Sequence, residues 1–216
     1  MSEQELIGNF LNVKGYDSFS KENRKSCLTL ALKEARRVAG RDEDGKPKWE
    51  TSSIDLDDLI ENINWHGRVL LGLTSYLIIL EMIGSVVRKG NSSEKHIGNG
   101  IPNALNNFSD IHGEKAKGLD ALRNSLAHSF SLSNNSSRFI MDTTLSEIIM
   151  LPELSDNCQK NTYSKDEKYS TKVNPLKIVQ LVEAVYEKVV NEFQNSNLEF
   201  VNRMNEDKLL VKYTII

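Results

Sequence analysis

The stretch from Val69 to Val87 constrains the fold most, because every residue in it is apolar or small except Glu81. Arg68 precedes this stretch and Arg88 follows it. Its length would just span a bilayer. However, an acidic side chain near mid-depth costs about 2.5–3.5 kcal/mol on insertion scales. We therefore expect the buried central helix of a water-soluble bundle, with no membrane-spanning segment.

The composition fits one soluble domain with a sizeable core. The chain has 216 residues, of which 39% are hydrophobic and 26% are charged. A formal net charge of −3 argues against a protein that coats nucleic acid, but not against an enzyme that grips a short stretch of RNA. Cys27 and Cys158 form no disulfide framework, and no secretory signal opens the sequence. We expect a cytoplasmic location.

The apolar periodicity predicts an all-α bundle around the central helix. Helical patterns cover residues 21–38, 55–62, 65–89, 104–111 and 115–128. The last strong helix opens at Asn174-Pro175, where asparagine caps free N–H groups and proline suits the first helical position. Its apolar stripe consists of Ile178, Val182, Val185, Val189 and Phe193.

A small β insertion is expected directly after the helix predicted over residues 115–128. Residues that favour strands surround the polar run 133–137, which predicts a hairpin around residues 129–142. Near the end of the chain, residues 198–204 favour a helix and 209–216 favour a strand. The expected organisation is a lead-in over residues 1–20, a helical domain over 20–195 and a C-terminal extension over 196–216.

The segment from Arg123 to His128 carries the residues of greatest chemical interest. On a helix, Asn124 and His128 lie together on the side opposite the apolar stripe, and Arg123 lies at the edge of that stripe. The stripe, which we expect to face the core, consists of Leu119, Leu122, Leu126 and Phe130. An arginine and a histidine at such spacing are common on solvated helix faces, so this geometry alone does not define a site.

The run Leu122-Arg123-Asn124-Ser125-Leu126-Ala127-His128 resembles the signature of HEPN domains. That signature is an arginine, a polar residue that is often asparagine, and a histidine after four to six intervening positions. The order of a long helix, a motif helix and a final long helix also agrees with the family. The resemblance covers about residues 20–195, but only the six-residue motif is specific. It implies an up-and-down helical bundle of HEPN type.

The resemblance also implies a metal-independent endoribonuclease that works as a homodimer. The two subunits would meet through the motif helix, with their two motifs facing each other across a two-fold axis. The catalytic residues would be Arg123, Asn124 and His128, with no metal and no other cofactor. The 2′-OH of the RNA would attack its own phosphate, His128 would act as acid or base, and Arg123 would stabilise the phosphate. Lys115 and Lys117 are candidates for binding the RNA substrate.

Other functions compete with this one. The family suggests a role as a toxin or in antiviral defence, with an antitoxin or defence protein as a possible partner. The alternative is a non-catalytic HEPN module that binds a nucleotide, RNA or a protein. In one subgroup a nucleotidyltransferase antitoxin modifies a tyrosine two residues after the histidine, but Phe130 stands there and has no hydroxyl. The spacing of His96, His112 and His128 matches no compact set of metal ligands.

Overall fold

The computed structural model describes residues 1–13, 25–46, 65–90, 100–133, 137–152, 170–201 and 204–215. Most of these residues are helical, which confirms the predicted helical character. The short helix predicted over 55–62 lies outside the described residues. The helices of the described part are α1 (Glu3–Leu11), α2 (Cys27–Val38), α4 (Trp65–Val86), α5 (Ile101–Phe108), α6 (Gly113–Ser129), α7 (Pro175–Gln194) and α8 (Glu206–Tyr213).

The strands amount to more than the predicted hairpin. Within the described ranges they form three small sheets: β1 (Lys25–Ser26) with β7 (Thr214–Ile215), β2 (Val87–Lys89) with β6 (Leu198–Phe200), and β3 (Phe139–Met141), β5 (Thr171–Val173) and β4 (Ile149–Met150) in the order β3-β5-β4. Near the predicted hairpin, Ser133 and Arg138 form only an isolated antiparallel bridge. Strand β3 instead pairs in parallel with β5. These partners are far apart in sequence, so local patterning does not reveal them.

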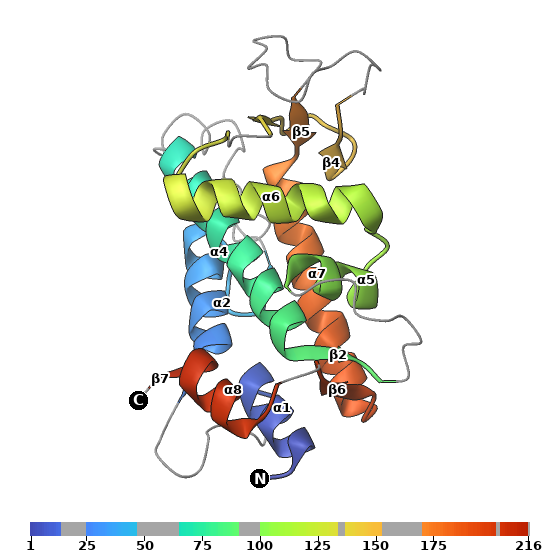
Figure 1. The fold of residues 1–216 in the computed structure, drawn as a ribbon. Coiled ribbons are helices and arrows are strands. Elements are labelled where there is room, and N and C mark those ends of the chain that lie inside the picture. Colours follow the sequence, from blue (N-terminus) through green and yellow to red (C-terminus); the bar gives the residue numbers. More distant parts are fainter. Residues whose placement is uncertain are drawn as a thin grey trace.

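Helices α2, α4 and α7 run side by side, and α6 crosses one end of this group (Figure 1). Strands β4 and β5 lie beyond α6, whereas α1 and α8 lie at the opposite end of the molecule with both chain termini (Figure 1). The motif helix is thus a cap on the bundle rather than one of its parallel members.

The centre of the bundle is α4, as the apolar stretch predicted. Its fully buried side chains include Tyr76, Leu77, Ile79, Leu80 and Ile83. Among the described helices, none combines the length and the apolar character needed to cross a bilayer.

Both ends of the chain pack into the same core as α4. Helix α1 begins with a capping box between Ser2 and Glu5 and buries Ile7 and Phe10 in that core. At the other end, the strand predicted over 209–216 is wrong for most of its length, because α8 runs to Tyr213 and buries Leu209. The helix predicted over 198–204 is also wrong where it begins, since residues 198–200 form β6.

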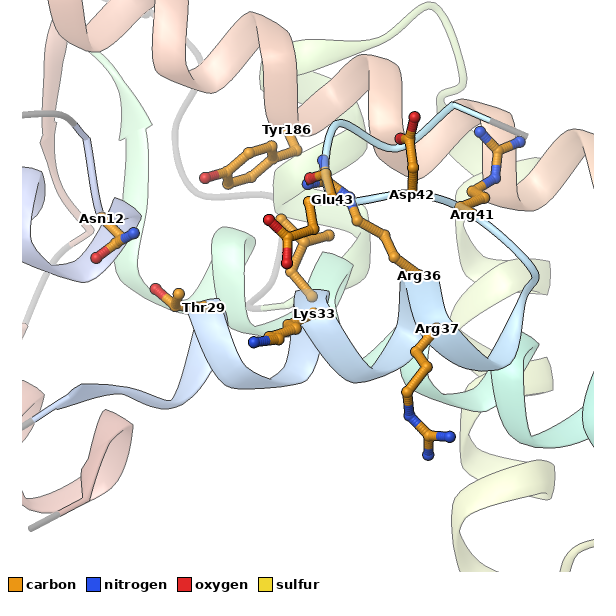
Figure 2. Close-up of a pocket in the computed structure, with 10 residues that line it drawn as sticks. Asn12, Thr29, Lys33, Arg36, Arg37, Arg41, Asp42, Glu43 and Tyr186 are labelled. Carbon is orange, nitrogen blue, oxygen red and sulfur yellow. The ribbon is translucent and has the colours of Figure 1, made fainter. Parts of the chain in front are cut away.

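A cavity of about 520 Å³ lies where α2, α7 and the C-cap of α1 meet the loop formed by residues 41–46 (Figure 2). Hydrogen bonds within this loop hold its shape. The Asp42 carboxylate accepts from the backbone N–H groups of Asp44 and Lys46, at 3.0 and 2.8 Å. The backbone N–H of Asp42 donates to the carbonyl of Lys46 at 2.9 Å.

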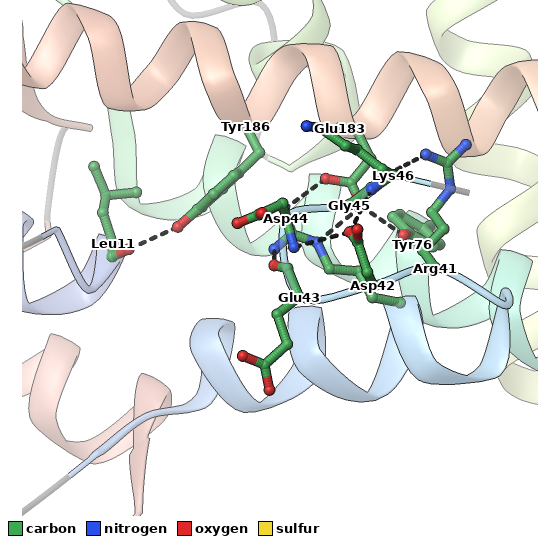
Figure 3. Close-up of polar contacts among 11 residues, drawn as sticks. Leu11, Arg41, Asp42, Glu43, Asp44, Gly45, Lys46, Tyr76, Glu183 and Tyr186 are labelled. Carbon is green, nitrogen blue, oxygen red and sulfur yellow. Dashed lines mark hydrogen bonds and ion pairs between the residues drawn. The ribbon is translucent and has the colours of Figure 1, made fainter. Parts of the chain in front are cut away.

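The carboxylate of Glu183, buried in the middle of α7, ties this region together (Figure 3). It accepts two hydrogen bonds from the Arg36 guanidinium of α2, at 3.0 and 2.7 Å, and one from the Tyr76 hydroxyl of α4, at 2.6 Å. Burial, together with this hydrogen bond, raises the pKa of the Tyr76 phenol well above its ordinary value. Arg36 also donates to the carbonyl of Glu43, which attaches the loop to α2.

Gly45 approaches this carboxylate closely. A Cβ atom at position 45 would stand 2.6 Å from Glu183 Oε2, and the backbone φ of +81° favours glycine in any case. The Arg41 guanidinium donates to the Gly45 carbonyl from the other side (Figure 3). The loop therefore rests directly on the buried ion pair.

Helices α4 and α5 approach each other to backbone contact at Gly84. A Cβ atom there would lie 1.9 Å from the carbonyl oxygen of Gly100 and 2.6 Å from the backbone nitrogen of Ala104. The Asn103 side chain donates to the Gly84 carbonyl at 2.6 Å. The position of α5 therefore depends on the absence of a side chain at residue 84.

We predict that Gly84→Ala destabilises the protein by about 1–3 kcal/mol or more, because the added methyl group meets backbone atoms that can move only if the two helices separate. Urea unfolding measures this change. Gly72→Ala in the same helix is the matched control, since its Cβ would make ordinary contacts, the nearest at 3.6 Å to Val38 Cγ1. Equal stability of the two variants would contradict the close approach of α4 and α5.

Candidate functional site

The motif helix α6 buries the face that its periodicity predicts, apart from Phe130. Leu119, Leu122 and Leu126 are fully buried. Phe130 was expected in the core, but it is 65% exposed, because the helix ends at Ser129 and Phe130 forms the left-handed C-cap with φ 47°. A residue past the end of a helix no longer follows its 100° rotation, so the stripe does not extend to position 130.

His128 lies in the last turn of α6 and is exposed to solvent. This confirms that the imidazole points away from the core of its own chain. Asn124 lies one turn earlier and is partly buried, and its side-chain amide donates to Asp120 Oδ2 at 3.4 Å. Asn124 is therefore close to His128 along the helix, but its side-chain amide donates its hydrogen bond to Asp120.

Arg123 is held by two carboxylates. Its Nη2 lies 2.5 Å from Glu81 Oε1 in α4 and 3.8 Å from Asp120 Oδ1 one turn back in α6. The side chain is only 16% exposed. Its Nε is buried and has no hydrogen-bond partner. The guanidinium thus joins the motif helix to the central helix, and its Nε–H is left unpaired inside the protein.

Glu81 is the site residue that the motif did not reveal. The sequence nevertheless contains a signal for it, since a lone acid in an apolar helix requires a cationic partner when the helix is buried. Tyr213 of α8 also belongs to this neighbourhood. Burial raises the pKa of its phenol, and the Ser85 hydroxyl one turn after Glu81 hydrogen-bonds it. The C-terminal helix therefore contacts the same face of α4 that anchors Arg123.

Lys115 and Lys117 lie in the first turns of α6, far from His128. Thirteen residues separate Lys115 from His128, which corresponds to about 20 Å along the helix axis. Both lysines form exposed ion pairs, Lys115 with Glu147 at 2.6 Å and Lys117 with Glu114 at 2.7 Å. The structure therefore brings Arg123, Asn124 and His128 to one end of α6 and leaves these lysines at the other.

Within the described residues, no group of three or more His, Cys, Asp or Glu side chains could hold a metal ion. His112 is the N-cap residue of α6 and lies 3.1 Å from the Asn106 side-chain oxygen. His96 lies outside the described residues.

Comparison with protein-family models, with curated proteins and with solved structures finds no match to this chain. The resemblance to HEPN domains therefore depends on the motif and on the order of the helices.

We predict that Glu81 and Arg123 are energetically coupled by about 1–2 kcal/mol, because the pair is largely shielded from water. A double-mutant cycle with Glu81→Gln and Arg123→Gln, followed by urea unfolding, measures the coupling. Glu34 and Arg37 provide the control pair, since they form a comparable contact at 2.8 Å with side chains 60% and 69% exposed. That control should give about 0.5 kcal/mol or less. Coupling no larger than in the control would refute an anchoring role for Glu81.

Proposed function

We propose that this chain is a metal-independent endoribonuclease of HEPN type, in which Arg123, Asn124 and His128 form the catalytic group. The observation that carries this proposal is the exposed His128 in the last turn of α6, one turn after Asn124 and on the same helix as an anchored arginine. A solvent-exposed histidine and an anchored guanidinium on the same helix are the chemical groups that RNA cleavage needs.

The reaction requires few groups because RNA supplies its own nucleophile. A base removes the proton from the 2′-OH, the oxygen attacks the adjacent phosphorus, and an acid protonates the departing 5′-oxygen. Imidazole changes its charge near neutral pH and serves in either role. A guanidinium stabilises the negative charge that develops on the phosphate oxygens. In this proposal Glu81 positions Arg123 through the ion pair at 2.5 Å.

The proposal includes a homodimer formed through the motif helix. One His128 cannot be base and acid in the same step, whereas two copies related by a two-fold axis would supply one histidine for each role. The exposed Phe130 beside His128 supports this arrangement, because a large apolar side chain at the end of α6 is suited to burial against a second copy.

One observation favours the alternative of a non-catalytic HEPN module that binds RNA, a nucleotide or a protein. Glu81 and Asp120 together carry more negative charge than Arg123 balances, which opposes the approach of a phosphate. In that alternative Arg123 serves only to hold α6 on α4. A role as a toxin or defence protein accompanies the ribonuclease and predicts growth arrest on expression that His128→Ala relieves.

We predict that His128→Ala lowers the rate of RNA cleavage by about 10²–10⁴-fold, because the variant lacks its acid–base group. A fluorogenic RNA oligonucleotide measures the rate, and EDTA should leave the wild-type rate unchanged. His112→Ala is the matched control, since it removes the histidine at the opposite end of the same helix. RNA that the wild type binds but does not cut would overturn the ribonuclease in favour of the binding module.

We also predict that replacing both Lys115 and Lys117 with glutamine raises KM for a long RNA several-fold and leaves kcat within about two-fold, because both lysines lie far from the scissile phosphate. Steady-state kinetics on a long and a short RNA separate the two constants. A fall in kcat without a change in KM would show that these lysines do not act as substrate-binding groups.

A further inference from the structure

The cavity between α2, α7 and the loop of residues 41–46 has the features of a ligand site. Its volume of about 520 Å³ lies in the range of small-molecule sites. No residue of the motif helix α6 lines it. The cavity is therefore separate from the site of the proposed ribonuclease, and a ligand there does not depend on that activity.

One face of α2 forms the polar floor of the cavity. Thr29, Lys33, Arg36 and Arg37 are spaced at intervals of four, three and one residues, which places them along the same side of the helix. Figure 2 shows Thr29 and Lys33 on α2, with the Tyr186 ring of α7 on the other side of the cavity. The chain therefore lines this space with cations on one wall and an aromatic ring on the opposite wall.

The cations of this cavity differ in how strongly they are engaged. Arg36 is bound by the buried carboxylate of Glu183. Figure 2 shows the Arg37 guanidinium directed away from Lys33 and Tyr186. Its pair with Glu34 is exposed and is worth little, so the guanidinium can turn toward a ligand at small cost. Lys33 is exposed at the cavity. Lys33 and Arg37, four residues apart on α2, are therefore the cations best able to meet an incoming anion.

Among the described residues, the carboxylates that line the cavity are Asp42 and Glu43. The Asp42 carboxylate accepts from two backbone N–H groups of the loop, so its charge is already stabilised locally. Figure 2 shows the exposed Glu43 side chain directed toward α2, so an anionic ligand must displace it from the cavity.

Two buried polar atoms of the cavity residues have no hydrogen-bond partner. They are Thr29 Oγ1 and Arg41 Nε, and Arg41 as a whole is only 8% exposed. Buried polar groups are nearly always paired, and each unpaired one costs stability. Both atoms are enclosed by the protein, so neither is accessible to a ligand in the cavity.

Hydrogen bonds hold the loop of residues 41–46 and the Tyr186 side chain in place without a ligand. The loop is closed by its own hydrogen bonds and is attached to Arg36 through the carbonyl of Glu43. The Tyr186 hydroxyl donates to the carbonyl of Leu11 at 2.9 Å, and its ring lies 5.9 Å from the Arg36 guanidinium carbon. A preformed cavity spares the ligand the entropic cost of ordering it.

We propose that this cavity binds a small organic phosphate with a flat body. The phosphate would contact Lys33 and Arg37, and the flat body would lie against Tyr186. Forked guanidinium donors match a phosphate well, and the permanent charge of arginine persists at all physiological pH values. The confined volume favours a small molecule over a nucleic-acid chain.

Isothermal titration with phenyl phosphate, which combines one ring with one phosphate, tests the proposal on the full-length protein. We expect a Kd of about 1 mM or tighter for the wild type. Replacing both Lys33 and Arg37 with glutamine should weaken binding at least about ten-fold, since both lost cations contact the phosphate. The matched control replaces Lys208 and Lys212, which are also exposed and four residues apart but lie on α8.

Titrations with benzoate and with inorganic phosphate test which chemical groups of the ligand are recognised. Benzoate should bind at least several-fold more weakly than phenyl phosphate, and equal binding would overturn the assignment of a phosphate. Inorganic phosphate should also bind more weakly, and equal binding would remove the flat body from the proposal. No heat from phenyl phosphate at concentrations of about 10 mM would overturn the proposal as a whole. So would an RNA oligonucleotide that binds through Lys33 and Arg37 when phenyl phosphate does not.

Discussion

The buried carboxylate of Glu183 is the interaction on which much of the remaining structure depends. It joins α7 to Arg36 of α2 and to Tyr76 of α4, so three helices meet at one negative charge. Removing one partner of such a pair typically costs about 3–5 kcal/mol, because the other charge is left buried without compensation. The loop that closes the cavity rests on the same group through Gly45. The architecture of the bundle and the shape of the cavity beside α2 therefore have a common origin.

The elements that the sequence predicted well are those whose signals are local. Helix α7 begins at Pro175 with Asn174 as its cap, and the asparagine side chain accepts from the backbone N–H groups of Leu176 and Lys177 as the pair predicted. The apolar stretch around Tyr76 likewise forms the central helix as predicted, because its signal is also local. Such features need only the residues within one or two turns.

The elements that the sequence predicted poorly depend on distant partners. Residues 209–213 are rich in strand-favouring side chains, yet they form α8, because Leu209 is buried in the core and Tyr213 packs edge-on against Phe10 of α1. Tertiary packing outweighs intrinsic propensity here. The short strands pair with segments that are distant in the sequence, as β2 does with β6, so no local pattern predicts them.

The candidate site also has one feature that could be predicted from local sequence and one that could not. The exposure of His128 follows from helical periodicity and could be predicted. The direction of Arg123 could not, because it depends on Glu81, which lies 42 residues earlier in the chain. A long flexible side chain takes its orientation from the nearest opposite charge, and only the packing of α6 on α4 shows which charge that is.

The contact between Gly45 and Glu183 also limits how this chain can diverge in evolution. A methyl group at position 45 would collide with the carboxylate, and the φ of +81° would strain any other L-residue there. Shortening the residue at 183 would remove the collision but not the backbone strain, and it would leave the Arg36 guanidinium without its buried carboxylate. A lineage that keeps this ion pair and this loop is therefore expected to keep glycine at position 45.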